Sequence, residues 1–80
     1  METKEFKDRI VVVMNHYNLT EEALATKLGF RPSNIAHLQS GRNLPSFEIL
    51  NRLITVFPDL NPRWLINGSG EMIDEDMARF

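Results

Sequence analysis

The sequence predicts an all-α fold, a compact single domain of five short helices. Apolar residues recur at helical spacing along most of the 80 residues, and no stretch before residue 71 alternates apolar and polar side chains as a strand would. Glycine or proline follows most of these stretches, where a helix would end. A chain of this length has room for one small core, and its apolar fraction of 42% is ample to fill it.

The first helix is expected at about residues 3–16. Its apolar positions fall on one face of a helix, which predicts a single buried stripe made of Phe6, Ile10, Val13, Met14 and Tyr17. Val11 and Val12 lie off that stripe and are expected to be partly exposed.

The middle of the chain predicts two short helices that meet at a tight corner. Thr20 is placed to cap the first of them, and Gly29 stands where it must stop at a positive φ. Ala25 stands where a larger side chain would hold the two helices apart. The second begins with Pro32 and stops before Gly41. The wedge between the two helices is expected to hold Leu24, Leu28, Ile35 and Leu38.

Two further helices are expected after this corner. Ser46 is placed to cap the fourth, which should end before Pro58. Its broad apolar face is formed by Ile49, Leu50, Leu53, Ile54 and Phe57. Asn61 and Pro62 form an N-cap and first-position pair for a short fifth helix that runs to Gly68.

Two segments carry a resemblance to a known family. The helix-turn-helix of lambda-repressor and Cro type regulators, the XRE-type family, is similar to the segment LTEEALATKLGFRPSNIAHLQSGRNLPS. The last helix of phage-type repressors is similar to NPRWLINGSGEM, so that the resemblance covers roughly residues 6–72. It implies a five-helix lambda-repressor-like domain over residues 1–70, with an acidic tail, arm or linker at residues 71–80.

The same resemblance implies a function. A protein of this family binds double-stranded DNA sequence-specifically, which here predicts a transcriptional regulator, expected to be a repressor. Two third helices in a homodimer would enter successive major grooves about 34 Å apart, so the operator should be a near-palindrome. No cofactor is expected.

The resemblance implies that the third helix reads the bases, through Pro32, Ser33, Asn34, Ala36 and His37. Small and polar side chains suit a major groove: a serine or a histidine can hydrogen-bond to base edges, and an asparagine can pair with adenine. Pro32 offers only an apolar contact, in place of the glutamine that many relatives have. The alternative interpretation is that these are ordinary solvated residues of a helix.

Contacts to the DNA phosphates are expected at both ends of that helix. Arg42 and Ser40 are the first candidates, and Asn43 is the next, because relatives lay the loop at residues 41–44 along the DNA backbone. Arg31 stands where a serine usually caps the helix, and exchanges the cap for a positive charge beside the phosphates. A solvated loop is the alternative.

The charge of the chain favours a dimer. The formal net charge is −2, and much of the negative charge lies in residues 71–80, which leaves the rest of the chain only slightly positive. Because phosphate neutralisation supplies much of the affinity for DNA, one such protomer should bind weakly alone. The resemblance places the second protomer against the fifth helix, where Trp64, Leu65 and Ile66 are expected to share core and interface roles.

Few residues of the sequence suit a catalytic or metal-binding role. His16 and His37 have no partner at metal-ligand spacing, and the chain has no cysteine, so neither catalysis nor a metal site is expected. No apolar run approaches the length that spans a membrane, and the N-terminus has no apolar core of a signal peptide. These features predict a cytoplasmic protein with no membrane partner.

Three alternatives remain open on the same fold. The chain could be an antitoxin whose DNA-binding domain also sequesters a toxin protein. It could be a protein-interaction module that has lost DNA reading, which Pro32, Glu21 and the negative net charge would explain. It could also be the N-terminal part of a longer repressor that dimerises through a C-terminal domain.

Overall fold

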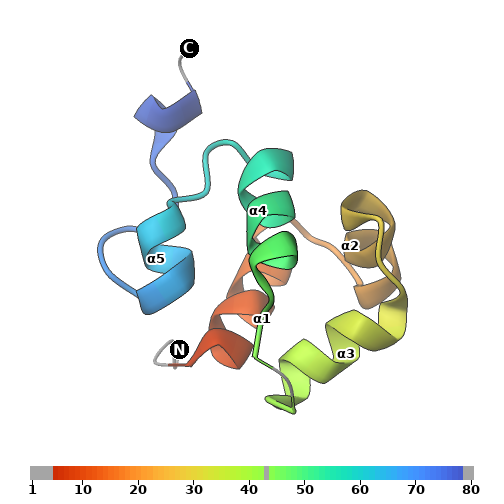
Figure 1. Cartoon of the computed structure of the whole chain (residues 1–80). Coiled ribbons are helices and arrows are strands. Elements are labelled where there is room, and N and C mark those ends of the chain that lie inside the picture. Colours follow the sequence, from red (N-terminus) through yellow and green to blue (C-terminus); the bar gives the residue numbers. More distant parts are fainter. Residues whose placement is uncertain (1–4, 43, 79–80) are drawn as a thin grey trace.

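The computed structural model of the chain describes residues 5–42 and 44–78. Within these residues the fold is all-α, as predicted (Figure 1). The only β pairing among them is an isolated bridge. The elements are α1 (Phe6–His16), α2 (Glu21–Leu28), α3 (Pro32–Ser40), α4 (Phe47–Val56), α5 (Pro62–Asn67) and the 3-10 helix η1 (Glu75–Ala78). No helix among the described residues has both the length and the apolar character needed to cross a membrane.

The helix ends lie where the capping residues predict them. Thr20 Oγ1 accepts a hydrogen bond from Ala23 N at 3.1 Å, and Ser46 Oγ accepts one from Ile49 N at 3.2 Å. The carbonyl oxygen of the Asn61 side chain accepts one from the backbone N–H two residues later at 3.0 Å. The helix expected from about residue 3 is described from residue 6 onwards, and residues 1–4 lie outside the described part.

One apolar core holds the helices together. It is built around α1, which packs against both α3 and α5, while α2 packs against α3 and α4. Every core residue is an apolar side chain that the structure buries: Ile10, Val13, Met14, Leu24, Ala25, Leu28, Ile35, Leu38, Ile49, Leu53, Phe57, Leu60, Trp64 and Leu65. Val11 and Val12 are half-buried, as expected for positions beside the stripe.

A buried arginine fastens α5 to α1. The Nε and Nη2 atoms of Arg9 donate to the carbonyl oxygens of Leu65 at 2.8 Å and Ile66 at 2.9 Å. Only 4% of Arg9 is exposed. Burial lowers its pKa, and the neighbouring carboxylate of Asp8 partly offsets that change. An arginine remains charged at neutral pH, so these are charge-assisted bonds to the last turn of a helix.

The first residues of the acidic C-terminal segment are hydrogen-bonded to the residues just before α5. Asn61 N donates to Met72 O at 2.8 Å, Asp74 N donates to Asp59 O at 2.8 Å, and Leu60 pairs with Ile73 as an antiparallel bridge. Met72 and Ile73 pack against the core. The folded unit therefore extends past residue 70, where the tail, arm or linker was expected to begin, to at least residue 74. Residues 79–80 lie outside the described part.

Candidate nucleic-acid interface

The connection between α2 and α3 is short and held in place by α4. Gly29 ends α2 at φ +76°, the left-handed conformation that glycine adopts at low cost. The Nη1 atom of Arg52 in α4 donates to Leu28 O at 2.7 Å, and the guanidinium carbon lies 5.1 Å from the ring centroid of Phe30. Arg52 was not singled out from the sequence, where it is one polar residue among several in a helix. It holds the end of α2 and the connection that leads to α3 against α4.

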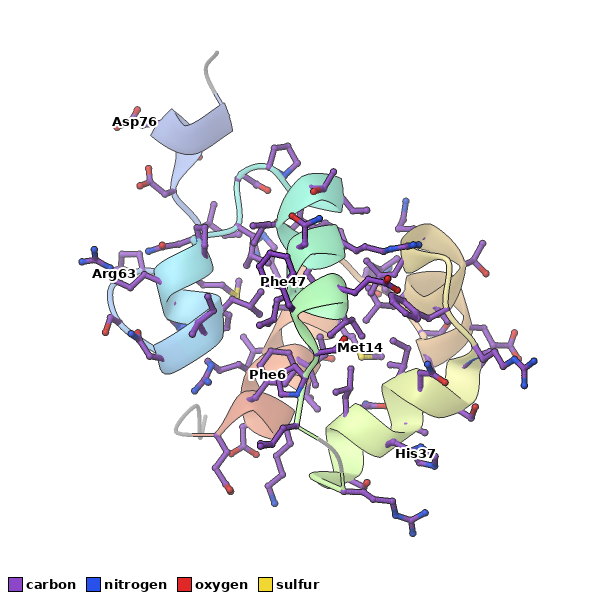
Figure 2. The ribbon with its side chains drawn as sticks, in the orientation of Figure 1. Phe6, Met14, His37, Phe47, Arg63 and Asp76 are labelled. Atoms are coloured by element: carbon purple, nitrogen blue, oxygen red, sulfur yellow. The ribbon has the colours of Figure 1, made fainter. Side chains whose placement is uncertain are left out.

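α3 has a buried face and an outer face. Ile35 and Leu38 are 0% and 5% exposed, and they attach the helix to the core. The residues predicted to read bases lie on the remaining surface, where Pro32, Ser33 and Asn34 are exposed and Ala36 and His37 are half-buried. His37 points away from the bundle in Figure 2. The structure therefore brings these five residues together on one accessible side of α3.

The polar side chains on that outer face are not used by the fold. Within the described residues, Ser33, Asn34 and His37 form no side-chain hydrogen bond or ion pair with the chain. Unused donors and acceptors at a surface can be satisfied equally well by water or by the edge of a bound partner.

The charges near α3 are positive. Arg31 and Arg42 stand at its two ends, both exposed, and residues 29–46 contain no other charged side chain. The two ion pairs found among the described residues lie elsewhere, between Lys7 and Glu5 and between Arg52 and Glu48. The arginines beside α3 are therefore not neutralised by a carboxylate of the described chain.

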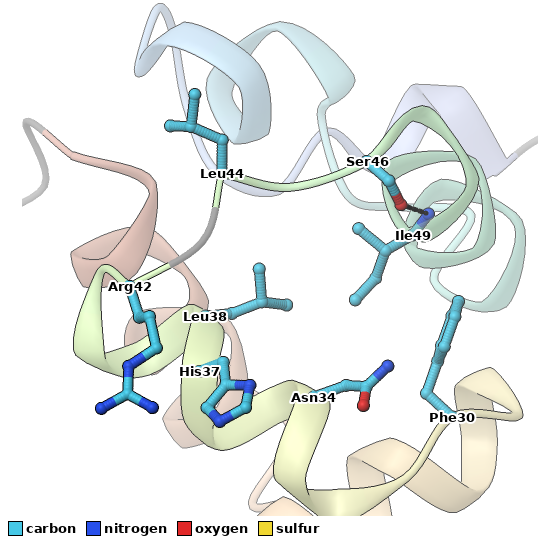
Figure 3. Close-up of a pocket in the computed structure, with 8 residues that line it drawn as sticks. All are labelled: Phe30, Asn34, His37, Leu38, Arg42, Leu44, Ser46 and Ile49. Carbon is cyan, nitrogen blue, oxygen red and sulfur yellow. Dashed lines mark hydrogen bonds between the residues drawn. The ribbon is translucent and has the colours of Figure 1, made fainter.

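An open cleft of about 540 Å³ separates α3 from the start of α4 (Figure 3). Leu38 and Ile49 point into it from the two helices, while His37 and Arg42 point outward from its α3 side. The hydroxyl of Ser46 on the opposite wall is engaged with Ile49 N as a helix cap. The cleft combines an apolar floor with a polar and basic edge.

The residues predicted to bind phosphates are not equally available for that role. Arg31 is exposed and makes no side-chain cap hydrogen bond to α3, as predicted. Ser40 is exposed, but its hydroxyl already donates to His37 O at 2.9 Å and accepts from Arg42 N at 3.3 Å, which helps to end the helix. Asn43 lies outside the described residues.

The three residues expected to share core and interface roles differ in their burial. Leu65 is 0% exposed and Trp64 is 6% exposed, so the first fills the core and the second is almost wholly buried there. Both residues therefore have the core role that was expected of them. Ile66, which is 55% exposed, is the most accessible of the three.

Two large apolar side chains at the surface were missed in the sequence. Leu44 is 92% exposed and Phe47 is 83% exposed. Phe47 does not belong to the apolar stripe of α4, which contains Ile49 and Leu53, and this offset was the available signal. Leu44 stands in a loop, where no periodicity reports the direction of a side chain.

The chain matches no protein-family model, no curated protein and no solved structure at a significant level. A functional interpretation therefore depends on the residues and geometry of this chain.

Proposed function

We propose that the protein binds double-stranded DNA sequence-specifically, with α2 and α3 acting as a helix-turn-helix on a lambda-repressor-like domain. The observation that carries the proposal is the outer face of α3. It presents Ser33, Asn34 and His37 with no partner in the described chain, and an exposed arginine stands at each end.

The dimensions of α3 suit a major groove. An α-helix with its side chains is roughly 10–12 Å wide, and the major groove of B-DNA is about 12 Å wide. A helix lying in that groove has base edges along its outer face and a phosphate backbone on either side. Ser33, Asn34 and His37 would then read bases, while Arg31 and Arg42 would contact phosphates.

The regulatory role follows from occupancy of DNA. A homodimer would place two α3 helices in successive major grooves about 34 Å apart and would select a near-palindromic site. Such a complex over a promoter would block transcription without any catalytic step. We therefore propose a transcriptional repressor.

Selection of bound DNA from a random pool tests this proposal, because a recovered motif reports specificity and half-site spacing together. With that motif as probe, Ser33→Ala or His37→Ala should each weaken discrimination at one position by about 1–3 kcal/mol while the protein stays folded. An equal loss of binding to every sequence would assign the residue to a phosphate contact instead.

Arg42→Ala supplies the electrostatic test, with Arg63→Ala as a control that removes the same charge from an exposed position on α5. Arg42→Ala should weaken binding to all sequences and reduce the slope of log K against log salt by about 1, since one fewer phosphate is neutralised. Arg63→Ala should leave the slope unchanged. Equal slopes for Arg42→Ala and the unaltered protein would contradict this role.

Failure to retain any DNA at low salt would reject the proposal. A stable complex with another protein, together with that failure, would identify a protein-interaction module. A stable complex with a toxin, together with specific DNA binding, would identify an antitoxin.

A further inference from the structure

We propose that Lys7, in the first turn of α1, is a further contact to the DNA phosphates and that it exchanges Glu5 for a phosphate when DNA binds. The inference rests on the proposed function, because it adds a residue of α1 to the DNA-binding surface formed by α3. It extends that surface beyond the helix-turn-helix. The sequence did not single Lys7 out, since it is one charged residue among several near the N-terminus.

Lys7 lies against the end of α3. Gly41 follows this helix at φ +77°, and a Cβ built there would lie 3.0 Å from Lys7 Cδ and 3.9 Å from Lys7 Cε. The aliphatic stem of the lysine therefore packs on a residue without a side chain, one position before Arg42. Figure 1 shows the start of α1 beside the end of α3.

A shallow groove of about 280 Å³ confirms the placement of Lys7. The groove is lined by Lys7 from the first turn of α1, and by Leu38, Gly41 and Leu44 from the end of α3 and the loop after it. A lysine can bury its stem along apolar surface while its ammonium group stays in water. The side chain of Lys7 is 40% exposed, as expected for this arrangement. Its charge is therefore held next to the loop that carries Arg42.

The ion pair that Lys7 makes within the chain is weak. Lys7 Nζ lies 3.8 Å from Glu5 Oε2, which is longer than a hydrogen bond, and the Glu5 side chain is 69% exposed. Water and salt screen such a pair, so it adds little to stability. A phosphate oxygen is also an anionic acceptor for an ammonium group, and it can replace the carboxylate at small cost.

Lys7 and Arg42 are placed to contact the same DNA backbone. When α3 lies in a major groove, a phosphate backbone borders the groove on each side, and the end of α3 meets one of the two. Arg42 stands at that end, and Lys7 packs beside it on Gly41. Each phosphate that a cation neutralises releases counterions, so a second cation there should raise the affinity for every sequence.

Salt titrations of the full chain test the inference, with one duplex that carries the selected motif and one duplex of mixed sequence. Lys7→Met removes the charge and keeps an unbranched apolar stem, so the variant should remain folded. It should reduce the slope of log K against log salt by about 1 for each bound protomer. Binding to both duplexes should weaken about fivefold, the effect of one ion pair in water. Lys7→Arg should keep the original slope, because it retains the cation.

Lys27→Met is the matched control. It removes the same charge from an exposed position in the last turn of α2, beside a groove between α2 and α4, and should leave the slope unchanged. An unchanged slope for Lys7→Met would overturn the inference, while a reduced slope for Arg42→Ala in the same titrations would keep the proposed function. Failure of the unaltered chain to retain either duplex would reject both.

Glu5→Gln tests the exchange of partners. Glu5 is the N-cap residue of α1 but makes no side-chain cap hydrogen bond, so the amide should be tolerated. By releasing the ammonium of Lys7, the variant should bind both duplexes about two- to threefold more tightly, the size of a weak surface pair. The same change made together with Lys7→Met should give a smaller gain. An equal gain would mean that Glu5 only repels phosphate, and would overturn the exchange.

Discussion

α3 and α5 are built from similar local signals but are attached to the molecule differently. Each has a proline in its first turn and a glycine after its last residue, and each buries two apolar side chains. The N-cap residue of α5 makes a side-chain hydrogen bond, while that of α3 makes none. Arg9 reaches from α1 to the last carbonyl groups of α5. Among the described residues, no side chain of another element hydrogen-bonds to α3.

α5 is held to the rest of the fold by hydrogen bonds as well as by apolar packing, whereas α3 is held to it by apolar packing. The polar groups at the end of α5 are satisfied inside the fold, whereas those on the outer face of α3 remain available to a partner. Substitutions on the outer face of α3 should therefore change binding with little effect on folding. Substitutions of the residues that fasten α5 should lower the stability of the fold with little direct effect on binding.

Arg9→Ala should give the largest loss of stability. It removes a 4% exposed side chain and leaves two backbone carbonyl groups at the end of α5 without their donor. Unsatisfied buried groups and lost packing of the aliphatic stem should together cost about 2–4 kcal/mol. Urea denaturation, with the midpoint and slope fitted together, measures the change.

Arg63→Ala is the control for this substitution, because it removes an exposed arginine from the same helix. Its effect should stay within about 0.5 kcal/mol. Equal losses of stability for the two substitutions would contradict the difference between α3 and α5, because Arg9 would then stabilise the fold no more than an exposed arginine does.

The glycine that ends α2 allows a second, smaller test. Gly29→Ala and Gly41→Ala both place a Cβ on a residue with positive φ, at +76° and +77°, and each should cost about 1 kcal/mol for that reason. At Gly29 the new atom would also lie 2.6 Å from Arg52 Nη1. Because that nitrogen donates a hydrogen bond to Leu28 O, we expect Gly29→Ala to lower the free energy of unfolding by about 1 kcal/mol more than Gly41→Ala does.

At Gly41 the neighbouring atom is Lys7 Cδ at 3.0 Å, on a flexible side chain that can move away. Thermal unfolding of the two variants side by side therefore isolates the contribution of Arg52. Equal losses for the two glycines would show that Arg52 adjusts freely and does not fix the corner between α2 and α3.

The sequence predicted the parts of the fold that depend on neighbouring residues. Thr20, Ser46 and Asn61 cap helices through bonds to residues two or three positions away, which is why these helix starts could be placed. The buried faces followed from helical periodicity. Arg9 could not be found in this way, because its partners lie 56 and 57 residues away.

The sequence predicted the positions of some residues of the candidate site better than those of others, for the same reason. Helical spacing indicated which side of α3 faces outward, and Ser33 and Asn34 lie there. It did not distinguish Trp64, which is buried, from Ile66, which is exposed, because burial in a short helix depends on which other helices pack there. Specificity for DNA is not encoded in periodicity at all, and remains a prediction for the binding experiments.

The last effect, similar in size to that of Gly41→Ala, is expected where α1 meets the connection before α5. Tyr17 donates to an Asp59 carboxylate oxygen at 2.7 Å, and its ring stacks on Phe57 at a centroid distance of 4.2 Å. Tyr17→Phe keeps the stack and removes only the hydroxyl. Because Asp59 is partly exposed and can be hydrated, the loss at pH 7 should be about 1 kcal/mol.

This loss should depend on pH in a defined direction. Burial, the hydrogen bond to Asp59 and the negative charge of that carboxylate all raise the pKa of Tyr17 above its ordinary value. An unfolded tyrosine releases its proton near pH 10, before the folded one, so the stabilisation is complete below pH 10 and declines as the pH rises further. Urea denaturation of both proteins between pH 7 and 11 should show their difference shrinking above pH 10. A difference that grows with pH would mean that Tyr17 ionises more easily in the folded state, which would contradict the hydrogen bond to the Asp59 carboxylate as the source of the stabilisation.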